Sequence, residues 1–558
     1  MAAPALNIAH LQTLLDDWDK EQPQPQTHAA FGVPLEQVRC APRDALKDVV
    51  VAFRTRPPLP NEAAEKFRAE SEFCRGITAA GAQPGVFVAH VPSTKWNGVT
   101  LSHKTYNADL AFGSAVDNEE VYQRAVVAND VLSMALSGGV GCVLAYGQTG
   151  SGKTHTMEGL EHRIARDLFE EARVLGKRLA EAHAGEVPDE IFEFRVTFLE
   201  LLGKRASDLL EVTTEDENAV RSEVAVREDT VGNVRPALVS TAVGSSEELE
   251  NLINKALSHR RTSATLRNAK SSRSHAVLTI SIKNVLLPFS AEGQLILVDL
   301  AGSERYEDSK EHDKQRMNEV RENNSSLMNL KECVRAKARM SADEGFVHVP
   351  WRTNKLTMLL KPIFDIESRQ PSRAIIIAHV SPHIQDSIHS TNTLSYAAPF
   401  MTALPKAKGP APYDVSDPRT WDHEQTVTWL TRQFAKPALA SRLATWKVKE
   451  KAAILAGKKL KPLEPLASED VDIGVDVLQI CPVGSTANNV GALYAAEFVE
   501  RCLQARTRPT VGGGQAAFSK MAIEVSGELS YLFMKAKTRT RNELMKTRKT
   551  WNAKEIYS

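Results

Sequence analysis

The stretch of this sequence best suited to chemistry is a glycine-rich loop that ends in a lysine and a threonine. It reads GQTGSGKT from Gly147 to Thr154, between an apolar run at 140–146 and a segment of helical character. In such a loop the glycines let backbone N–H groups approach phosphate oxygens, Lys153 neutralises their charge, and the Thr154 hydroxyl is placed for magnesium. The pattern predicts a cradle for a nucleoside triphosphate, and a glycine-rich turn without a ligand is the alternative.

Two later segments carry groups that could sense the terminal phosphate. DLAGSE at 299–304 follows an apolar run, so Asp299 could hold magnesium through water and the Gly302 N–H could reach the phosphate. NAKSSRSH at 268–275 offers hydroxyls and a guanidinium that suit magnesium and phosphate. Taken singly, the acid could be a helix cap and the serine-rich stretch an ordinary loop. The three segments in this order favour a phosphate-sensing site.

Strands and helices must hold these loops in place. Apolar runs at 49–53, 191–202, 277–287, 295–300 and 374–380 predict strands, with helical patterns between them. The run at 191–202 alternates, which predicts a wetter face toward a sheet edge, whereas 295–298 is apolar on both faces. A strand that is apolar on both faces lies centrally, with helices on both sides, so the predicted fold class is α/β.

Together the three segments resemble the kinesin motor domain. GQTGSGKTHTMEG at 147–159, NAKSSRSH at 268–275 and LVDLAGSE at 297–304 resemble its phosphate loop and its first and second switches. Supporting strings are RTRP at 54–57, FLELLGKRASDLL at 198–210, HVPWRTNKLT at 348–357 and NTLSYA at 392–397. The resemblance covers about residues 45–400. It implies a kinesin-like P-loop NTPase with a central mixed, mostly parallel sheet flanked by helices on both faces, plus a mainly helical C-terminal region.

The resemblance implies ATP and Mg²⁺ as cofactors and gives roles to individual residues. Arg273 and Glu304 would pair when the γ-phosphate is present and orient the attacking water, with Ser271 and Gly302 as further catalytic residues. Thr154, Ser272 and Asp299 would hold the metal. The residues assigned to the nucleotide are Arg54, Arg56, Pro57, Gly147, Gln148, Thr149, Gly150, Ser151, Gly152, Lys153, Thr154 and His155, of which Arg54, Arg56, Pro57 and His155 would frame the adenine.

A predicted helix after the second switch is the expected microtubule-facing element. Lys331 and Arg335 are four residues apart and share one face of it, and a solvated charged face is the alternative. With Arg352 and Lys355 in the following loop, they would face the acidic surface of tubulin. The string LKECVRA at 330–336 also resembles the microtubule-depolymerising internal-motor kinesins.

Several positions depart from the family pattern. The Lys-Val-Asp tip of the depolymerising subfamily is absent from the region 93–100, and the usual Glu-Ile-Tyr-Asn is replaced by ELLG at 200–203. Asn323 takes the place of an isoleucine and Met358 that of a basic residue. After Ala397 no neck linker or coiled coil is recognisable, so processive walking is not expected.

The sequence therefore predicts an ATP-hydrolysing microtubule motor that depolymerises microtubules or regulates their ends. A motile kinesin is one alternative, and a non-cycling ATP-binding anchor is another. As an enzyme it is expected to be a microtubule-stimulated ATPase, located in the cytoplasm on the microtubule cytoskeleton, with the spindle as a candidate site. The expected partner is tubulin, with an adaptor bound through the C-terminal region as a further candidate, and the oligomeric state stays open.

Composition and texture set the remaining expectations. The chain of 558 residues has 69 lysines and arginines and 69 aspartates and glutamates. It therefore carries no net charge that would attract a polyanion to the protein as a whole. Six scattered cysteines favour a reducing compartment, and no secretion signal, membrane span or nucleic-acid partner is expected. The predicted parts are an N-terminal helix and linker at 1–44, the motor-like domain at 45–403, a Pro/Gly linker at 404–420, a helical region at 421–510, and a hinge with a basic tail at 511–558.

Two features of the C-terminal part stay open. The pattern from Trp421 onward faintly resembles a sterile-alpha-motif bundle, and a generic helical bundle fits it better. The basic tail could bind acidic tubulin surfaces or nucleic acid, although no stacking aromatic residues suggest contacts with bases, or it could be a solvated, disordered end.

Overall fold

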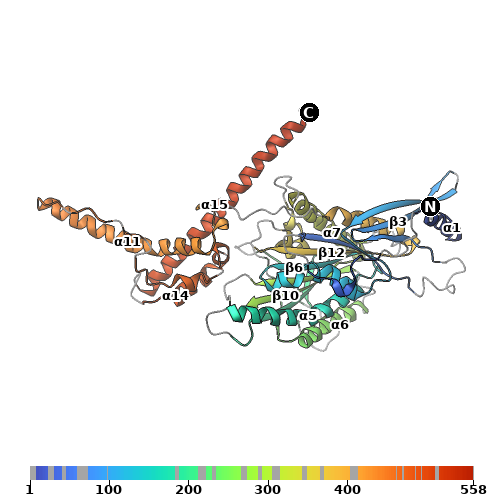
Figure 1. Cartoon of the computed structure of the whole chain (residues 1–558), viewed down its shortest axis with the longest axis horizontal. Helices are drawn as coiled ribbons and strands as arrows, with labels where there is room; N and C mark the ends of the chain where they lie inside the picture. Colours follow the sequence, from blue (N-terminus) through green and yellow to red (C-terminus); the bar gives the residue numbers. More distant parts are fainter. Residues whose placement is uncertain are drawn as a thin grey trace. The chain divides into compact units, whose positions relative to one another are not determined.

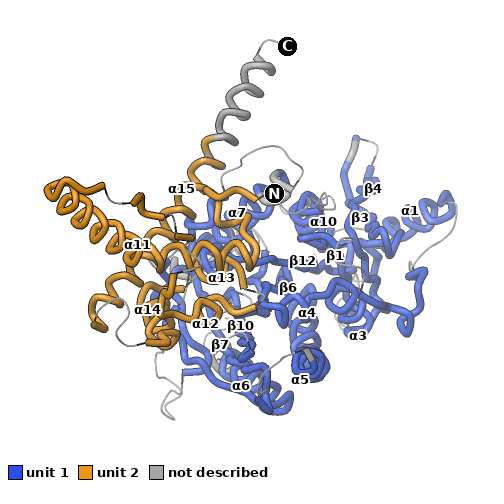
Figure 2. Tube along the Cα trace, turned by 60° about the vertical axis from the view of Figure 1, so that its left-hand side comes forward, with its two compact units in different colours: residues 1–286, 292–406 blue, residues 287–291, 407–558 orange. Residues whose placement is uncertain are grey.

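We describe a computed structural model of the chain, shown in Figure 1. It describes residues 8–22, 30–40, 46–59, 73–96, 98–182, 188–211, 222–228, 234, 236–265, 273–286, 292–303, 314–341, 349–364, 370–401, 413–459, 461–464, 466–467, 471–483, 485–491, 493–508 and 514–556. The chain divides into two compact units, coloured in Figure 2. Unit 1 comprises residues 1–286 and 292–406, and unit 2 comprises 287–291 and 407–558.

Unit 1 is built on a nine-stranded sheet whose described strands confirm the predicted mixed architecture. The order is β5 (Leu110–Phe112), β1 (Val49–Thr55), β12 (Ser372–Val380), β6 (Val140–Gly147), β11 (Gly293–Asp299), β10 (Ser274–Asn284), β7 (Phe192–Leu202) and β8 (Arg205–Asp208), with β9 (Thr241–Val243) paired to β7. Pairing is parallel from β5 to β11 and antiparallel from β11 onward. The run at 295–298 is central as predicted, and β7 lies next to the short edge strand β8.

Side chains alternate along these strands, so each strand contributes to two separate cores. In β6, Cys142, Leu144 and Tyr146 enter one core, while Val143 and Ala145 enter the other. The first face is covered by α7 (Lys314–Ser341), α8 (Lys355–Leu359), α9 (Lys361–Phe364) and α10 (Ser387–Ala397), and the second by α4 (Val131–Leu136), α5 (Lys153–Ala182) and α6 (Ser246–Thr265). Helices therefore cover both faces, as the apolar strands predict.

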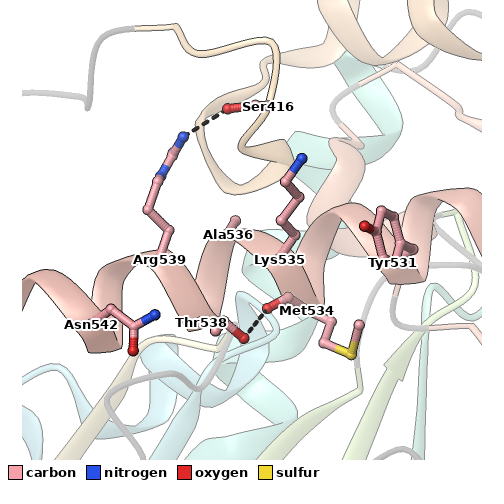
Figure 3. A pocket seen from close by; sticks show the side chains of 8 residues that line it. All are labelled: Ser416, Tyr531, Met534, Lys535, Ala536, Thr538, Arg539 and Asn542. Carbon is pink, nitrogen blue, oxygen red and sulfur yellow. Dashed lines mark hydrogen bonds between the residues drawn. The ribbon is translucent and has the colours of Figure 1, made fainter.

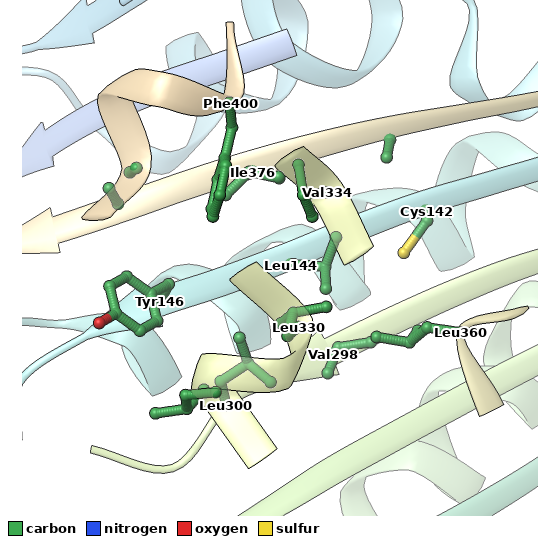
Figure 4. Packing of buried hydrophobic residues seen from close by; sticks show 14 of the residues in the cluster. Cys142, Leu144, Tyr146, Val298, Leu300, Leu330, Val334, Leu360, Ile376 and Phe400 are labelled. Atoms are coloured by element: carbon green, nitrogen blue, oxygen red, sulfur yellow. The ribbon is translucent and has the colours of Figure 1, made fainter. Parts of the chain in front are cut away.

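On the first face, α7 is anchored by its apolar stripe. Leu330 and Val334 lie against side chains of β6, β11 and β12, as Figure 4 shows. These two residues are four apart and therefore share one side of the helix. The opposite side of α7 is left for polar and charged residues.

A second, three-stranded antiparallel sheet lies beside the main one in unit 1. It consists of β2 (Ile77–Ala82), β3 (Gly85–Lys95) and β4 (Gly98–Ala108), and Trp96 at the hairpin tip is 98% exposed. The predicted N-terminal helix is α1 (Ile8–Glu21), whose Leu11 and Leu15 are buried in a cluster with Cys74 and Ile384. Because those contacts belong to unit 1, α1 is a docked element.

Short helices complete unit 1. They are η1 (Leu35–Gln37), α3 (Asn118–Val121), η3 (Tyr122–Val127), η6 (Trp351–Thr353), η7 (Ile384–Asp386) and η8 (Ala398–Phe400). Asp117 caps α3 by accepting the backbone N–H of Glu120.

Unit 2 is a helical bundle with its own core. Its elements are η9 (Pro418–Thr420), α11 (His423–Leu455), α12 (Val477–Ile480), α13 (Ala487–Val490), α14 (Ala495–Gln504) and α15 (Gln515–Ile556). The start of α11 carries a capping box between Asp422 and Gln425, which fixes where the helix begins. The predicted helical region is confirmed, while the sterile-alpha-motif resemblance stays a prediction.

The C-terminal segment differs from the predicted tail. Phe518, Ala522, Val525, Leu529 and Phe533 recur at helical spacing and are buried in the same core as the rest of unit 2. The first half of α15 is thus a bundle helix. The predicted hinge at 510–513 lies outside the described residues.

Two further observations bear on the composition argument. All six cysteines are free thiols. Among the helices in the described ranges, none combines the length and apolar character that crossing a membrane requires.

Candidate nucleotide and switch site

The glycine-rich loop joins the end of β6 to the start of α5. Gly147 and Gly152 have φ angles of +151° and +99°, a region that favours glycine. A Cβ atom on Gly147 would lie 2.2 Å from the His379 carbonyl oxygen on β12. The neighbouring strand therefore requires glycine at this position, and the strand–loop–helix context predicted for a phosphate cradle is present.

Cationic and dipolar groups converge on this loop. Lys153 is buried, and its Nζ donates to the carbonyl oxygens of Gly147 and Gln148 at 2.9 Å each. Ser151 Oγ donates to Gln148 O at 2.7 Å and tightens the turn. Since Lys153 is also the first residue of the 30-residue α5, the positive end of that helix adds to its charge. The loop suits an anion such as a phosphate.

The metal-side residues Thr154 and Asp299 are in contact. Thr154 Oγ1 donates to Asp299 Oδ2 at 2.9 Å, which joins the start of α5 to the end of β11. Arg260 on α6 forms a buried ion pair with the same oxygen at 2.8 Å and donates to Ser274 O at 3.0 Å. Within the described part of the chain, the buried Asp299 Oδ1 has no hydrogen-bond partner. A hydroxyl beside a carboxylate oxygen of this kind fits a hard cation such as Mg²⁺.

Arg260 was not singled out from the sequence, although it holds Asp299. It lies in HRR at 259–261, before the first switch-like segment, and nothing in the string distinguishes it from Arg261. The side chains of Arg260 and Asp299 are 4% and 7% exposed. Only the packing of α6 against α5 and the sheet shows that Arg260 turns inward.

Arg54, predicted to help frame the adenine, is buried in this structure. Its guanidinium donates to Asn118 Oδ1 at 2.5 Å, Thr156 Oγ1 at 2.8 Å and Val116 O at 3.2 Å. Burial lowers the pKa of Arg54 to about 10. Arg54 thus ties β1 to the start of α3 and to α5, and its role toward the adenine stays a prediction.

The other adenine-side residues lie nearer the surface. Arg56 Nε donates to Gly150 O at 2.6 Å, so its side chain runs along the loop. Pro57 and His155 are exposed. These three residues remain candidates for framing a base beside the loop.

His379 on β12 is a second residue that the sequence did not reveal. Its Nδ1 lies 3.0 Å from Ile377 O and its Nε2 lies 2.7 Å from Thr156 Oγ1. Because a carbonyl can only accept, Nδ1 carries the proton and Nε2 accepts from Thr156. Burial lowers the pKa of His379 well below its ordinary value, so the ring is neutral. The neutral ring fixes the Thr156 hydroxyl just inside α5.

The switch-like segments reach the loop through their described residues. The Ser303 N–H donates to Gly147 O at 3.1 Å, so the segment that contains the buried Gly302 lies against the phosphate loop. Arg273 lies at the entrance to β10. Ser271, Ser272 and Glu304 lie outside the described residues, and the pairing of Arg273 with Glu304 stays a prediction.

The predicted microtubule-facing residues are each engaged by neighbouring side chains. Lys331 Nζ lies 4.9 Å from the centroid of the Tyr396 ring, and burial lowers the pKa of Lys331. Arg335 pairs with Glu332 at 3.3 Å. Beyond α7, Arg352 pairs with Glu228 at 2.8 Å and Lys355 with Glu223 at 3.1 Å. Of the Lys-Glu-Cys element only the first two residues can face a partner, because Cys333 is fully buried.

A hollow in unit 2 is lined by residues that belong to none of these motifs. Figure 3 shows its lining on α15, where Tyr531 and Met534 are exposed and Arg539 donates to Ser416 Oγ at 2.7 Å. No cluster of three or more histidine, cysteine, aspartate or glutamate side chains suited to a metal occurs in the described ranges. The phosphate loop of unit 1 is therefore the candidate site.

The fold and this loop define a P-loop nucleotide-binding protein with two switch-like segments. The Kinesin motor domain family matches residues 54–402, and the chain belongs to that family. Kinesin motor domains bind nucleotide and microtubules and are microtubule-stimulated ATPases. The resemblance stated from the motifs is confirmed.

Individual relatives cover only part of the chain. It is 34% identical over 353 residues to diatom spindle kinesin-1 of Cylindrotheca fusiformis, covering 63% of this chain and 50% of that protein. It is 35% identical over 297 residues to kinesin-like protein KIN-13B of Arabidopsis thaliana, covering 52% of this chain and 39% of the relative. Kinesin-like protein KIF24 of Mus musculus is 36% identical over 307 residues, or 53% of this chain and 20% of the relative. The chain thus spans half or less of the length of these curated relatives.

A solved structure shows the same fold. It contains the C-terminal motor and motor homology domain of Kar3Vik1 fused to a synthetic heterodimeric coiled coil. The TM-score is 0.50 at 23% identity, and the match covers 64% of this chain and 86% of that chain.

Proposed function

We propose that this chain hydrolyses ATP to ADP and phosphate with Mg²⁺ and couples that turnover to microtubule binding. The observation that supports this most directly is the contact between Thr154 and Asp299. This contact joins the phosphate loop to the second switch-like segment. A site that senses the terminal phosphate must bring these two segments together. Ser303 N–H to Gly147 O is a second link between the same two segments.

In this proposal each group has a role set by its position. Lys153 and the N-terminus of α5 hold the phosphates, and Arg54, Arg56, Pro57 and His155 frame the base. Thr154, Asp299 and Ser272 hold Mg²⁺, which when bound neutralises charge on the phosphate oxygens. Arg273 and Glu304 pair across the two switches and orient the attacking water, with Ser271 and Gly302 beside the terminal phosphate. Phosphoryl transfer depends more on positioning of the phosphate and the water than on covalent chemistry by the protein, and these groups would supply that positioning.

The test is ATP turnover by the full chain with and without microtubules. We expect stimulation by microtubules, and we expect Glu304→Ala to keep ATP binding while losing stimulated turnover. Lys153→Ala should lose nucleotide binding itself. A chain that binds microtubules with no stimulated phosphate release would be a non-cycling anchor, and the proposal would fail.

We further propose that the motor acts on microtubule ends, with depolymerisation as the output. Support comes from the Lys331-Glu332-Cys333 element on α7, which is similar to that of the depolymerising internal-motor kinesins. The relatives named KIN-13B and KIF24 are compatible with that placement. The hairpin of β3 and β4, by contrast, lacks the Lys-Val-Asp tip of the subfamily and carries the exposed Trp96 in that region.

Stabilised microtubules observed with ATP distinguish the outputs. Shrinkage from both ends supports depolymerisation, and gliding of microtubules over an immobilised layer supports a motile motor instead. We infer that tubulin is the partner and that the microtubule cytoskeleton is the location. This follows from the roles predicted for Lys331, Arg335, Arg352 and Lys355. A relative is called a spindle kinesin, so the spindle is a candidate location, and unit 2 is a candidate adaptor site.

A further inference from the structure

A chain of four hydrogen bonds joins the two switch-like segments to the interior of α7. The backbone N–H of Ala301 donates to His275 Nδ1 at 3.0 Å, and His275 Nε2 lies 2.9 Å from Ser326 Oγ. Ser326 Oγ lies 2.7 Å from the Asn323 carbonyl, and Asn323 Nδ2 donates to the Arg273 carbonyl. We call Ala301, His275, Ser326, Asn323 and Arg273 the switch–helix link.

The direction of every bond in the switch–helix link is fixed. Since Nδ1 of His275 accepts from a backbone N–H, its proton must sit on Nε2, which then donates to Ser326 Oγ. The Ser326 hydroxyl is left to donate to a carbonyl, which can only accept. Burial lowers the pKa of His275 to about 3, so the ring keeps the neutral form that this arrangement needs. Every donor in the link has one acceptor and no bond competes with another.

Asn323 is the residue of the link that gives α7 a contact with Arg273. It is 4% exposed, and its amide is aimed from the helix at the backbone where the first switch-like segment enters β10. An aliphatic side chain at this position could not donate to that carbonyl. Asn323 is also one of the positions at which the sequence departs from the family pattern, which has an isoleucine there.

The same helix carries the predicted track contacts. Lys331 and Arg335 are 8 and 12 residues beyond Asn323, which is roughly 12 and 18 Å along the axis at about 1.5 Å per residue. Along α7 between Asn323 and Arg335, the buried residues Leu327, Leu330 and Val334 pack the helix against the sheet. A shift of the Arg273 backbone that pulls on Asn323 would therefore be carried to the track face as movement of a rigid helix.

We infer that Asn323 is a positioning residue that couples the state of the first switch to the placement of α7 on its track. The inference rests on the proposed function and adds to it the route of the coupling. Within the described part of the chain, the side chain of Asn323 forms its hydrogen bond with Arg273 and not with the phosphate loop or a residue assigned to the base. It acts through Arg273 on one side and through Ser326 and His275 on the other.

The test compares Asn323→Leu with Ser325→Ala, a control at an exposed position on the same helix. The readout is microtubule affinity in adenylyl imidodiphosphate and in ADP, measured by cosedimentation. We expect the ratio of the two affinities to fall about fivefold in Asn323→Leu and to stay unchanged in Ser325→Ala. Nucleotide affinity measured without microtubules should stay within about twofold of the wild-type value.

A merely structural role for Asn323 would give another pattern. Both microtubule affinities would then fall together, or the melting temperature would fall, with the ratio preserved, and either result overturns the inference. Ser326→Ala provides a second variant, since it cuts the link at His275 and should lower the ratio in the same direction. Hydrogen exchange of residues 321–336 should differ between the two nucleotide states in wild type and differ less in Asn323→Leu.

The failure of the proposed function is separately visible. If the wild-type chain shows no stimulated turnover and no nucleotide-dependent affinity, the proposed function fails and the inference falls with it. If wild type shows both and Asn323→Leu keeps the full ratio, only the inference fails.

Discussion

At the scale of single residues, the site depends on buried charges that hold each other in place. Asp299 accepts hydrogen bonds from Thr154 and Arg260, and its ion pair with Arg260 is almost wholly buried. Removing one member of such a pair leaves an uncompensated buried charge, which costs more than a surface pair ever contributes.

We expect Arg260→Ala to destabilise unit 1 by about 3 kcal/mol or more, because the buried carboxylate of Asp299 would lose its cationic partner. Urea unfolding measures the change. Arg166→Ala is the matched control, since Arg166 is half exposed and pairs with Asp167, and it should cost less than about 1 kcal/mol. Equal losses in the two variants would contradict the buried-pair argument.

Thr154→Ala should act on the metal and leave the fold alone. Thr154 is exposed, so we expect the free energy of unfolding to change little. The Mg²⁺ concentration needed for half-maximal ATP turnover should rise about tenfold or more, because one oxygen ligand is lost. Thr154→Ser keeps the hydroxyl and should restore the wild-type requirement. A Thr154→Ala enzyme with an unchanged Mg²⁺ requirement would remove Thr154 from the metal site.

At the scale of elements, the cations of the predicted track face are already paired within the protein. Glu223 and Glu228, in the segment at 222–228, pair with Lys355 and Arg352. Exposed pairs of this kind are weak, so an acidic partner surface can compete for the cations. The pairs set how much positive charge this part of unit 1 offers to a partner.

Glu223→Gln should therefore raise microtubule affinity by about two- to threefold at low salt, because Lys355 loses its competing carboxylate. Cosedimentation at two ionic strengths measures the effect, which should shrink as salt rises. Glu170→Gln on α5 removes the same charge from a pair with Arg173 and is the control. If both variants raise the affinity equally, net charge alone is responsible.

At the scale of the whole molecule, unit 1 holds the buried imidazoles of His90, His275 and His379 in the neutral form. Burial lowers the pKa of His90 and His275 to about 3 and that of His379 well below its ordinary value. His90 faces Thr78, His103, Trp18 and Arg75, the last of which lowers its pKa further. Each ring takes up a proton far more readily when the chain unfolds.

The stability that these three rings contribute should consequently fall as the pH drops below about 6.5, where imidazoles of the unfolded chain become charged. Their contribution is fully present above that pH and is lost progressively toward about pH 3. Each ring should lower the free energy of unfolding by about 1 kcal/mol between pH 7.5 and 5.5. The buried carboxyls of Glu161 and Glu171 act in the opposite direction, because burial raises their pKa to about 8 and about 7. Urea unfolding of wild type and of His90→Gln at both pH values isolates one ring, and the variant should lose about 1 kcal/mol less than wild type. An unchanged dependence in His90→Gln would contradict the assignment.

The sequence by itself determined the local features of this protein. Continuous apolar runs defined the strands at 49–53 and 374–380, and GQTGSGKT defined the turn between β6 and α5, since apolar runs and glycine placement are local properties. Motif order then sufficed to predict the family. The tertiary structure decided which side chains turn inward: Arg54 engages Asn118, Arg260 engages Asp299, His379 accepts from Thr156, and Asn323 reaches Arg273. Each of these contacts joins residues 39 to 223 positions apart. Their pairing depends on how helices pack against the sheet, and no local pattern in the chain records that.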